Sequence, residues 1–494
     1  MYQLDCGWTK SLVKVILSTI TEYHLPKIVP LIGLLYAPQT QAQELSYKGF
    51  DFHGSLAQTF AVSDGDNEYL ISKSDEGTFQ FTEALLNVSK QFTDDFRFGV
   101  QGIVRDFGDE DNFKPALDWG YADYRLSNYL GIRAGRVKAP IGFLGEARDV
   151  DSSHSSILLN QGLYPEWART ISNSYDGAGI YGSFGNFEMG FLDYHIFYGT
   201  KREMPDTFRM QRSLQQLDPS AEIELQEQIG ISLIYETPLE GLRLGLTQFQ
   251  ADTFSDLTVI NEFTGSRTIY PDEFDYRTKM HTFSGEYNWN KWTFTAEYTQ
   301  SLPDVDFSQS YTNAFAQSKI PPAQQVYDGT YQAVYQEVYD ATYDTVYQAM
   351  GGDFNPAAAG EADRIAQETG GAKATEEATK ARVAIDMAVQ GLQETVSDLA
   401  SVDISRDSRG WNFGTEYQWN DQLSLILRYG EEALKEKTTD PNFHRKDLSL
   451  GARYDFNQYL IGKVEYHRIR GKLGQISGDS YDTNFFLTRL SFSF

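Results

Sequence analysis

The 494-residue sequence has little cysteine, few long apolar runs and a shortage of positive charge. Its single cysteine, Cys6, excludes a disulfide scaffold and a metal site built from cysteines. The mean hydropathy is −0.45 and the one near-continuous apolar stretch is IVPLIGLLYA at residues 28–37, so a protein of membrane-spanning helices is excluded. Lysine and arginine number 42 against 69 aspartates and glutamates, which gives a net charge of −27. This charge argues against a nucleic-acid binder, because a duplex must be met by a basic surface.

Motifs for catalysis and for cofactor binding are also missing. None of the seven histidines is spaced as a metal-binding pair, and there is neither a G-x-x-x-x-G-K-[ST] phosphate loop nor a G-x-G-x-x-G segment after a strand. His154 lies in the segment SSHSS, but adjacency in the sequence is not the geometry of a catalytic triad. The sequence therefore predicts a protein that is not an enzyme and that carries no cofactor and no metal ion.

The first 42 residues are typical of an export signal. Lys10, Lys14 and Lys27 precede the apolar run, and small and polar residues then lead to an exit near Ala42. A membrane anchor is the alternative, but a run of only ten residues cannot span roughly 30 Å of hydrocarbon. We expect residues 1–42 to be a signal peptide and the mature chain to be exported.

From Lys48 to the C-terminus, apolar and polar residues alternate in runs of about ten residues that are separated by turn sequences. In WNFGTEYQW, residues 411–419, every second residue is aromatic or Thr415, and the intervening residues are polar or glycine. Because a strand has period two, such a run has one apolar face and one polar face. We count sixteen strands of this kind. In a soluble β-sandwich, which is the alternative, the apolar faces would point inward.

The connections between these strands alternate between very short and long. All short turns therefore fall at one end of the sheet and all long loops at the other, as in an outer-membrane barrel. Aromatic residues flank the short turns, where amphipathic rings suit a membrane interface; they are Phe92, Phe96, Phe184, Phe187, Trp289, Trp292, Phe456 and Tyr459. The sequence predicts an all-β membrane protein: a 16-stranded antiparallel transmembrane β-barrel in the outer membrane of a Gram-negative bacterium, in contact with lipid and lipopolysaccharide.

Sixteen strands leave an aqueous lumen, so the polar faces should form its wall. The alternation is ambiguous at 116–126 and 187–199, as it would be at a β-bulge. For each basic residue of the wall, the alternative role is a solvated side chain that is paired with a nearby carboxylate. The predicted basic wall residues are Arg97, Arg133, Lys138, Arg243, Arg428, Arg453, Lys463, His467 and Arg489.

The third long connection, residues 140–174, is too long and too mixed in composition for a simple surface hairpin. It contains an apolar patch (Ile157, Leu158, Leu159, Leu163, Tyr164 and Trp167), which folding into the barrel against the wall would bury. The charged side chains of the loop would then narrow the lumen, where charge discriminates between solutes. The predicted constriction residues are Glu146, Arg148, Asp149, Asp151 and Arg169.

This loop resembles the corresponding region of the phosphate-selective porin O/P family and of related 16-stranded proteobacterial outer-membrane porins. The matching positions are Gly135–Lys138, Pro140 and Gly142, Arg148–Val150, Ser156–Leu159, and Asp176 and Gly177. The resemblance implies a trimeric, passive channel for small hydrophilic solutes, often anions. Family members selective for phosphate carry a dense lysine and arginine array at the constriction, whereas here acidic residues are interleaved with Arg148.

Residues 302–405 differ in composition from the rest of the chain. Tyrosine recurs at every fourth position from Tyr327 to Tyr347, which marks one slowly winding face of a helix. A second segment, 357–400, is rich in Ala, Glu, Lys and Gln, and Gly370 and Gly371 offer a break within it. We expect an extracellular helical hairpin with a net charge of −11, from sixteen acidic and five basic residues. Its tyrosine and alanine faces can simply pack the two helices together. The alternative is a lid or docking module whose acidic surface binds divalent cations or repels anions, or whose exposed tyrosines bind sugars or a partner protein.

The predicted organisation has four parts: a signal peptide at 1–42, eleven barrel strands at 43–301 with the constriction loop, the helical insert at 302–405, and five barrel strands at 406–494. The function predicted from the sequence is a passive, homotrimeric outer-membrane porin for small hydrophilic solutes, with anions favoured. The alternative is a surface adhesion or receptor protein that uses the barrel as a mount for the helical insert.

Overall fold

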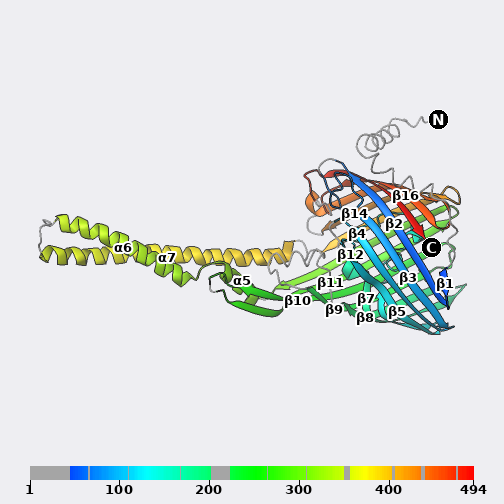
Figure 1. Ribbon diagram of the computed structural model, residues 1–494, viewed down its shortest axis with the longest axis horizontal. Helices are drawn as coiled ribbons and strands as arrows, with labels where there is room; N and C mark the ends of the chain where they lie inside the picture. Colours follow the sequence, from blue (N-terminus) through cyan, green and yellow to red (C-terminus); the bar gives the residue numbers. More distant parts are fainter. Residues whose placement is uncertain are drawn as a thin grey trace, which may run out of the picture.

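The computed structural model (Figure 1) describes residues 45–494 apart from 65–66, 109–110, 167–168, 202–222, 264, 308, 350–355, 403–406, 435–439 and 474–476. The predicted signal peptide, residues 1–42, lies outside the described residues. Within the described residues, no helix combines the length and the apolar character needed to cross a membrane.

One antiparallel sheet closes on itself to form a barrel. Each strand from β2 to β17 pairs with its neighbours in sequence, and the pairing of β17 with β2 completes the circle. β1 adds only a short hairpin to β2. The predicted 16-stranded antiparallel barrel is therefore confirmed. The strands are β1 (Leu45–Tyr47), β2 (Phe50–Ser63), β3 (Phe81–Thr93), β4 (Phe96–Phe107), β5 (Pro115–Ser127), β6 (Leu130–Lys138), β7 (Ser174–Asn186), β8 (Gly190–Lys201), β9 (Ile223–Glu236), β10 (Leu242–Ile260), β11 (Arg267–Trp289), β12 (Trp292–Phe307), β13 (Ser408–Gln418), β14 (Leu423–Leu434), β15 (His444–Asp455), β16 (Leu460–Arg470) and β17 (Asp482–Ser493).

The apolar faces of the strands point out of the barrel. On β13, Trp411 and Phe413 are 47% and 50% exposed, whereas Asn412 between them is 7% exposed. Such a belt of exposed aromatic and aliphatic side chains suits lipid and not water, so the alternative of a soluble sandwich is wrong. Aromatic rings beside the short turns, such as Phe184, Trp289 and Trp419, are also exposed.

The phase of β5 shifts within 116–126, where the sequence alternation is ambiguous, whereas β8 pairs in regular register from Phe191 to Gly199. Between Gln101 and Gly102 on β4, the pairing with β5 skips one residue, so Asp118 is the extra residue of a bulge and is 4% exposed. The register of β8 against β9 shifts between Gly199 and Lys201. Simple alternation does not assign Asp118 to the lumen, and the bulge in β5 is the reason that its side chain is buried there.

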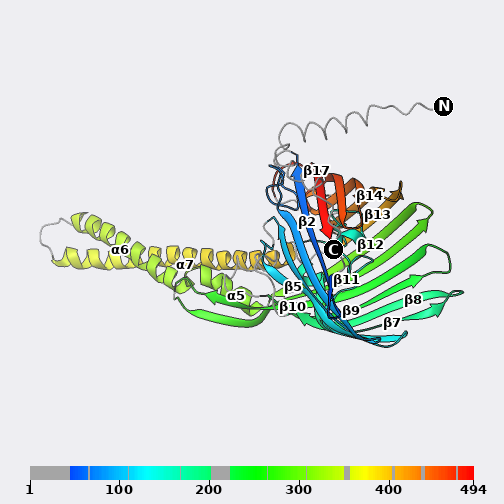
Figure 2. The same cartoon turned by 45° about the vertical axis from the view of Figure 1, so that its right-hand side comes forward.

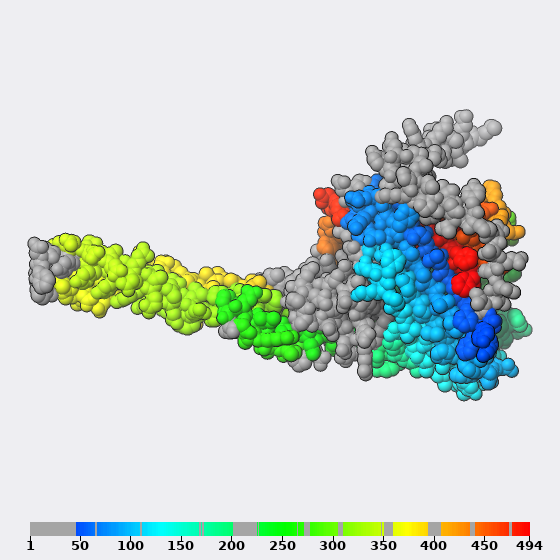
Figure 3. All heavy atoms as spheres, viewed as in Figure 1, coloured from blue at the N-terminus to red at the C-terminus, as the bar shows by residue number. Residues whose placement is uncertain are grey.

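The long connection from β12 to β13 forms a helical arm that projects away from the barrel (Figures 1 and 2). It contains α5 (Gln309–Lys319), α6 (Ala323–Ala349) and α7 (Pro356–Val402). With 47 residues, α7 is about 70 Å long. The space-filling view shows the arm as a narrow extension beside the bulky barrel (Figure 3). Shorter helical turns occur elsewhere, namely η1 (Asp151–Ser153), α3 (Arg169–Ser172) and η3 (Pro441–Phe443).

Tyrosines of α6 stack along a stripe that faces small residues of α7. Neighbouring rings from Tyr327 to Tyr343 lie 5.8–6.4 Å apart, and fully buried alanines recur on α7 at Ala362, Ala366, Ala374 and Ala378. The suggested break at Gly370 and Gly371 is absent, because α7 runs through both residues. A Cβ atom at Gly370 would lie 3.3 Å from the Tyr335 carbonyl oxygen, so this glycine permits close approach of the helices.

Candidate pore constriction

The connection between β6 and β7, residues 139–173 and here called L3, lies inside the barrel. Its Pro140 carbonyl accepts a hydrogen bond from Thr247 of β10 at 3.3 Å, and its Leu158 amide donates to Glu465 of β16 at 3.1 Å. L3 therefore reaches opposite parts of the wall. Its apolar residues Ile157, Leu158, Leu159, Leu163 and Tyr164 are all buried, and Trp167 lies outside the described residues.

Asp151 attaches L3 to the last two strands. Its carboxylate lies 3.0 Å from Lys463 Nζ and 2.7 Å from Arg489 Nε, and it accepts a hydrogen bond from Ser491. Arg489 also pairs with Glu83 on β3. Burial alone would raise the pKa of Asp151, but Arg489 and Lys463 outweigh burial and hold the pKa well below its usual range. Asp151 is therefore a charged anchor at neutral pH.

Glu166 forms a second anchor, to β4. Its carboxylate lies 2.5 Å from Arg105 and 3.0 Å from Arg148. Arg105 is also within 3.1 Å of Glu83 and 3.3 Å of Asp111. Burial raises the pKa of Glu166, yet the two guanidinium groups lower it to about 2.

A third anchor joins L3 to β5 and β6. Asp149 pairs with Lys138 and lies 2.5 Å from Arg169. Lys138 is also 2.7 Å from Asp118, the residue that the β5 bulge turns inward. The pKa of Asp149 is lowered because Arg169 and Lys138 overcome the cost of burial.

Glu146 differs from the other predicted constriction residues. Its side chain is 47% exposed and lies 3.1 Å from Arg133, which also pairs with Asp123 at 3.2 Å. Among Glu146, Arg148, Asp149, Asp151 and Arg169, this carboxylate is the one in contact with open solvent, while the other four are packed between L3 and the wall.

The remaining predicted wall residues form ion pairs, with one exception. Arg428 and Arg453 also donate to L3 carbonyl groups, namely those of Leu158 and of Ser152. Arg97 donates to Ser89 at 3.4 Å, and within the described residues no ion pair reaches it. The ion pairs are Arg243 with Glu286, Arg428 with Glu465, Arg453 with Asp455, and His467 with Asp447 and Glu465.

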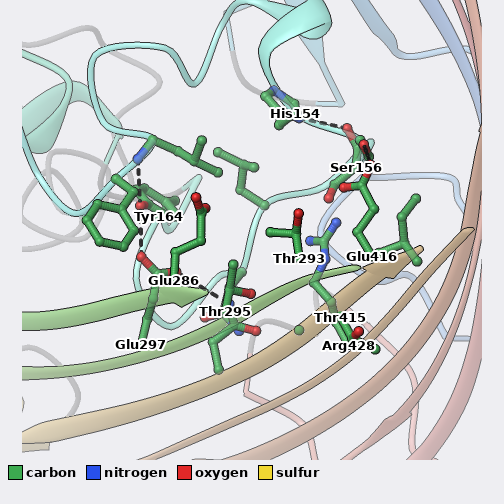
Figure 4. A pocket seen from close by; sticks show the side chains of 18 of the residues that line it. His154, Ser156, Tyr164, Glu286, Thr293, Thr295, Glu297, Thr415, Glu416 and Arg428 are labelled. Carbon is green, nitrogen blue, oxygen red and sulfur yellow. Dashed lines mark hydrogen bonds between the residues drawn. The ribbon is translucent and has the colours of Figure 1, made fainter. Parts of the chain in front are cut away.

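A cavity of about 150 Å³ remains between L3 and strands β11–β14 (Figure 4). This volume equals about five water molecules at their share of liquid volume. Three carboxylates, Glu286, Glu297 and Glu416, line it together with a single guanidinium, Arg428. His154 also lines it but is uncharged at neutral pH, because burial lowers its pKa to about 3. The described side chains around the cavity thus carry net negative charge.

Several residues of this region were not selected from the sequence. Arg105 carries the inward parity of β4, so alternation alone could have identified it, whereas the same alternation does assign Glu297 to the lumen wall. Glu166 lies within the loop segment GLYPEWAR, where no strand alternation or motif indicates which way its side chain points. Asp118 could not be assigned because the bulge changes its parity.

No known protein family and no curated protein matches this sequence. Solved structures do match most of the chain. OmpF of Salmonella typhi, in complex with daunomycin, is 10% identical with a TM-score of 0.48 and covers 92% of this chain and 100% of its own. OmpT of Vibrio cholerae is 10% identical with a TM-score of 0.46 and the same coverage. An anion-selective porin from Comamonas acidovorans is 10% identical with a TM-score of 0.47 and covers 90% of this chain and 99% of its own.

The chain folds as a closed 16-stranded antiparallel β-barrel. No match specific to the phosphate-selective porin O/P family accompanies this fold. Identities near 10% carry no information about the solute or the assembly of this protein.

Because carboxylates anchor L3 to the wall, the position of L3 should depend on pH. Because the pKa values of Asp149, Asp151 and Glu166 are depressed in the folded protein, their stabilisation is present above the unfolded pKa of about 4 and is lost as pH falls through the folded values. We expect the anchoring to weaken only below about pH 4 and L3 to detach as the pH falls through about 2, the folded pKa of Glu166, and below. Protease cleavage within L3, followed against pH, measures this. Release at pH 5 or above would contradict it.

Proposed function

We propose that this protein is a passive porin of a bacterial outer membrane, that L3 is its constriction, and that small hydrophilic solutes diffuse past L3. The observation that supports this most is L3 itself, a loop that crosses the lumen of a closed 16-stranded barrel and is bound to β4–β6, β10 and β12–β17 by its own charged and polar groups. An outer belt of apolar side chains matches residence in lipid. Export by residues 1–42 and assembly as a homotrimer are part of the same proposal.

The charge preference proposed here differs from the one favoured by the sequence. The sequence favours anions because it predicts basic residues along the wall. Those residues, apart from Arg97, are engaged in ion pairs with L3 or with the wall, whereas the cavity beside L3 is lined by three carboxylates and one guanidinium. We therefore propose a preference for cations. The anion preference stays a prediction from the sequence.

Single-channel recording in a planar bilayer under a potassium chloride gradient tests both parts. The expected result is an open channel whose reversal potential has the sign for potassium over chloride. The opposite sign would restore the anion preference, and the absence of any conductance would contradict the porin.

The adhesion or receptor alternative rests on the arm, whose helix α7 is about 70 Å long and points away from the barrel (Figure 2). Deletion of residues 309–402, with a short linker in their place, separates the two functions. A porin keeps its conductance after this deletion. A surface-binding protein loses attachment to its target, and its intact form does not conduct.

A further inference from the structure

The wall beside L3 gathers three carboxylates on neighbouring strands. The register aligns Ser284 of β11 with Glu297 of β12 and with Asn412 of β13. In the next inward-facing row Glu286 aligns with Thr295 and with Gly414, and in the third row Thr293 aligns with Glu416. Figure 4 shows Glu286, Glu297 and Glu416 around one space, with Arg428 at its side.

Glu297 is a buried carboxylate without a counter-ion. It is 8% exposed and accepts hydrogen bonds from Ser284 at 3.0 Å, Tyr164 at 3.3 Å and Asn412 at 3.4 Å. In the described part of the chain, no lysine, arginine or histidine lies within ion-pair distance of it. Asp149, Asp151 and Glu166, which are equally enclosed, each have two basic partners. A buried carboxylate is costly unless a positive charge meets it.

Asn412 adds an independent observation. It is 7% exposed and lines the cavity, and its Oδ1 atom has no hydrogen-bond partner among the described residues. The amide nitrogen of Asn412 donates a hydrogen bond to Glu297. The acceptor without a partner, Asn412 Oδ1, therefore lies beside the carboxylate without a counter-ion. Buried amide oxygens in folded proteins are normally satisfied. The Glu297 carboxylate and Asn412 Oδ1 together would suit a ligand that carries a positive charge and more than one N–H donor.

The rest of the cavity suits a short alkyl chain. Phe143, Leu144 and Ile426 line it beside the carboxylates. Gly414 also lines the cavity, and a Cβ atom there would be 2.5 Å from Thr295 Oγ1 and 3.3 Å from Arg428 Cγ, so the glycine keeps this space open. The described residues contain no group of three His, Cys, Asp or Glu side chains placed to hold a metal ion. The chemistry therefore favours an organic amine.

We propose that this cavity is a binding site for the primary ammonium group of small organic amines, with Glu297 as the counter-ion and Asn412 Oδ1 as a second acceptor. An ammonium group carries three donors, which suits two adjacent acceptors and a remaining contact to water or to Glu286. This inference rests on the proposed channel function, because the amine site would bind one class of solute as that solute passes L3.

The test is block of potassium current through the purified full-length protein by n-butylammonium. Two control solutes separate charge from shape: 1-butanol has the chain without the charge, and tetramethylammonium has the charge without N–H donors. We expect concentration-dependent block by n-butylammonium and at least about tenfold weaker block by either control, since a hydrogen bond to a charged group is worth about 1.5–3 kcal/mol. Equal block by all three solutes would overturn the proposal.

Two variants locate the site. Glu297→Gln keeps the shape of the side chain, and we expect it to raise the blocking constant of n-butylammonium about tenfold or more. The matched control is Asp455→Asn, which removes a wall carboxylate that is already paired with Arg453 at 2.8 Å, and it should change the constant less than about twofold. An unchanged constant in Glu297→Gln would overturn the assignment.

Failure of this inference can be distinguished from failure of the channel function. If the wild-type protein conducts but is not blocked by the amine, the porin function is supported and the amine site is overturned. If the wild-type protein does not conduct, titration calorimetry of n-butylammonium into the detergent-solubilised wild type and Glu297→Gln decides the site by itself. Heat of binding that is lost in the variant supports the site, and the absence of binding to both proteins overturns it.

Discussion

Replacement of Asp151 by asparagine should detach L3 from the last two strands and cost about 3–5 kcal/mol of stability, because two enclosed cations lose their shared counter-ion. Lys463 and Arg489 are 2% and 4% exposed, so water cannot replace the lost carboxylate without rearrangement of the loop. Once L3 moves, the lumen beside it should widen. We expect lower resistance to urea unfolding in detergent and a higher single-channel conductance.

Asp482→Asn provides the matched control for this experiment. Asp482 lies 3.1 Å from Arg470, but both side chains are more than 60% exposed. An exposed ion pair contributes only about 0–1 kcal/mol, so stability and conductance should both stay near the wild-type values. If Asp151→Asn behaved like this control, L3 would not depend on the Asp151 anchor.

Replacement of Ala366 by glutamate should separate the two long helices of the arm. Ala366 is fully buried on the face of α7 that packs against the α6 tyrosines, so the new carboxylate would have no room and no basic partner beside it. Burial of an unpaired charge costs several kcal/mol, about 3 or more. We expect loss of helical circular dichroism from the arm and rapid protease cleavage at its lysines and arginines.

The control for the arm is Ala372→Glu, on the same helix but at an exposed position. It makes the same chemical change and alters helix propensity equally, so it should leave the arm intact. Conductance should be unchanged in both variants, because the barrel closes without the arm. Equal helicity and protease resistance in the two variants would contradict packing of the alanine stripe on the tyrosines.

Features that depend on local periodicity could be predicted well from the sequence. Alternation with period two gave the strands and their faces, and short turns alternating with long loops gave the correct end for each connection. The tyrosine repeat gave a helix because side chains four residues apart share one face. Gly370 and Gly371 misled the prediction, since glycine weakens an isolated helix but here allows close packing against Tyr335.

The roles of the charged residues could not be predicted in the same way. Alternation identified Lys463 and Arg489 as wall residues but could not show that both meet Asp151, more than 300 positions earlier in the chain. Likewise, the vacant acceptor of Asn412 beside Glu297 exists only because three strands align in one register under L3.

The local chemistry of the chain was thus sufficient to predict a barrel with an apolar outer face and a polar inner face, an apolar patch on one loop, and a separate pair of helices. Strand period, turn residues and helix period act over a few neighbouring residues, so one sequence contains them completely. The path of L3 across the lumen, the pairing of its carboxylates and the acidic cavity beside it were decided by the tertiary structure. The reason is physical: ion pairing and burial depend on distances between segments, and closure of the barrel sets those distances.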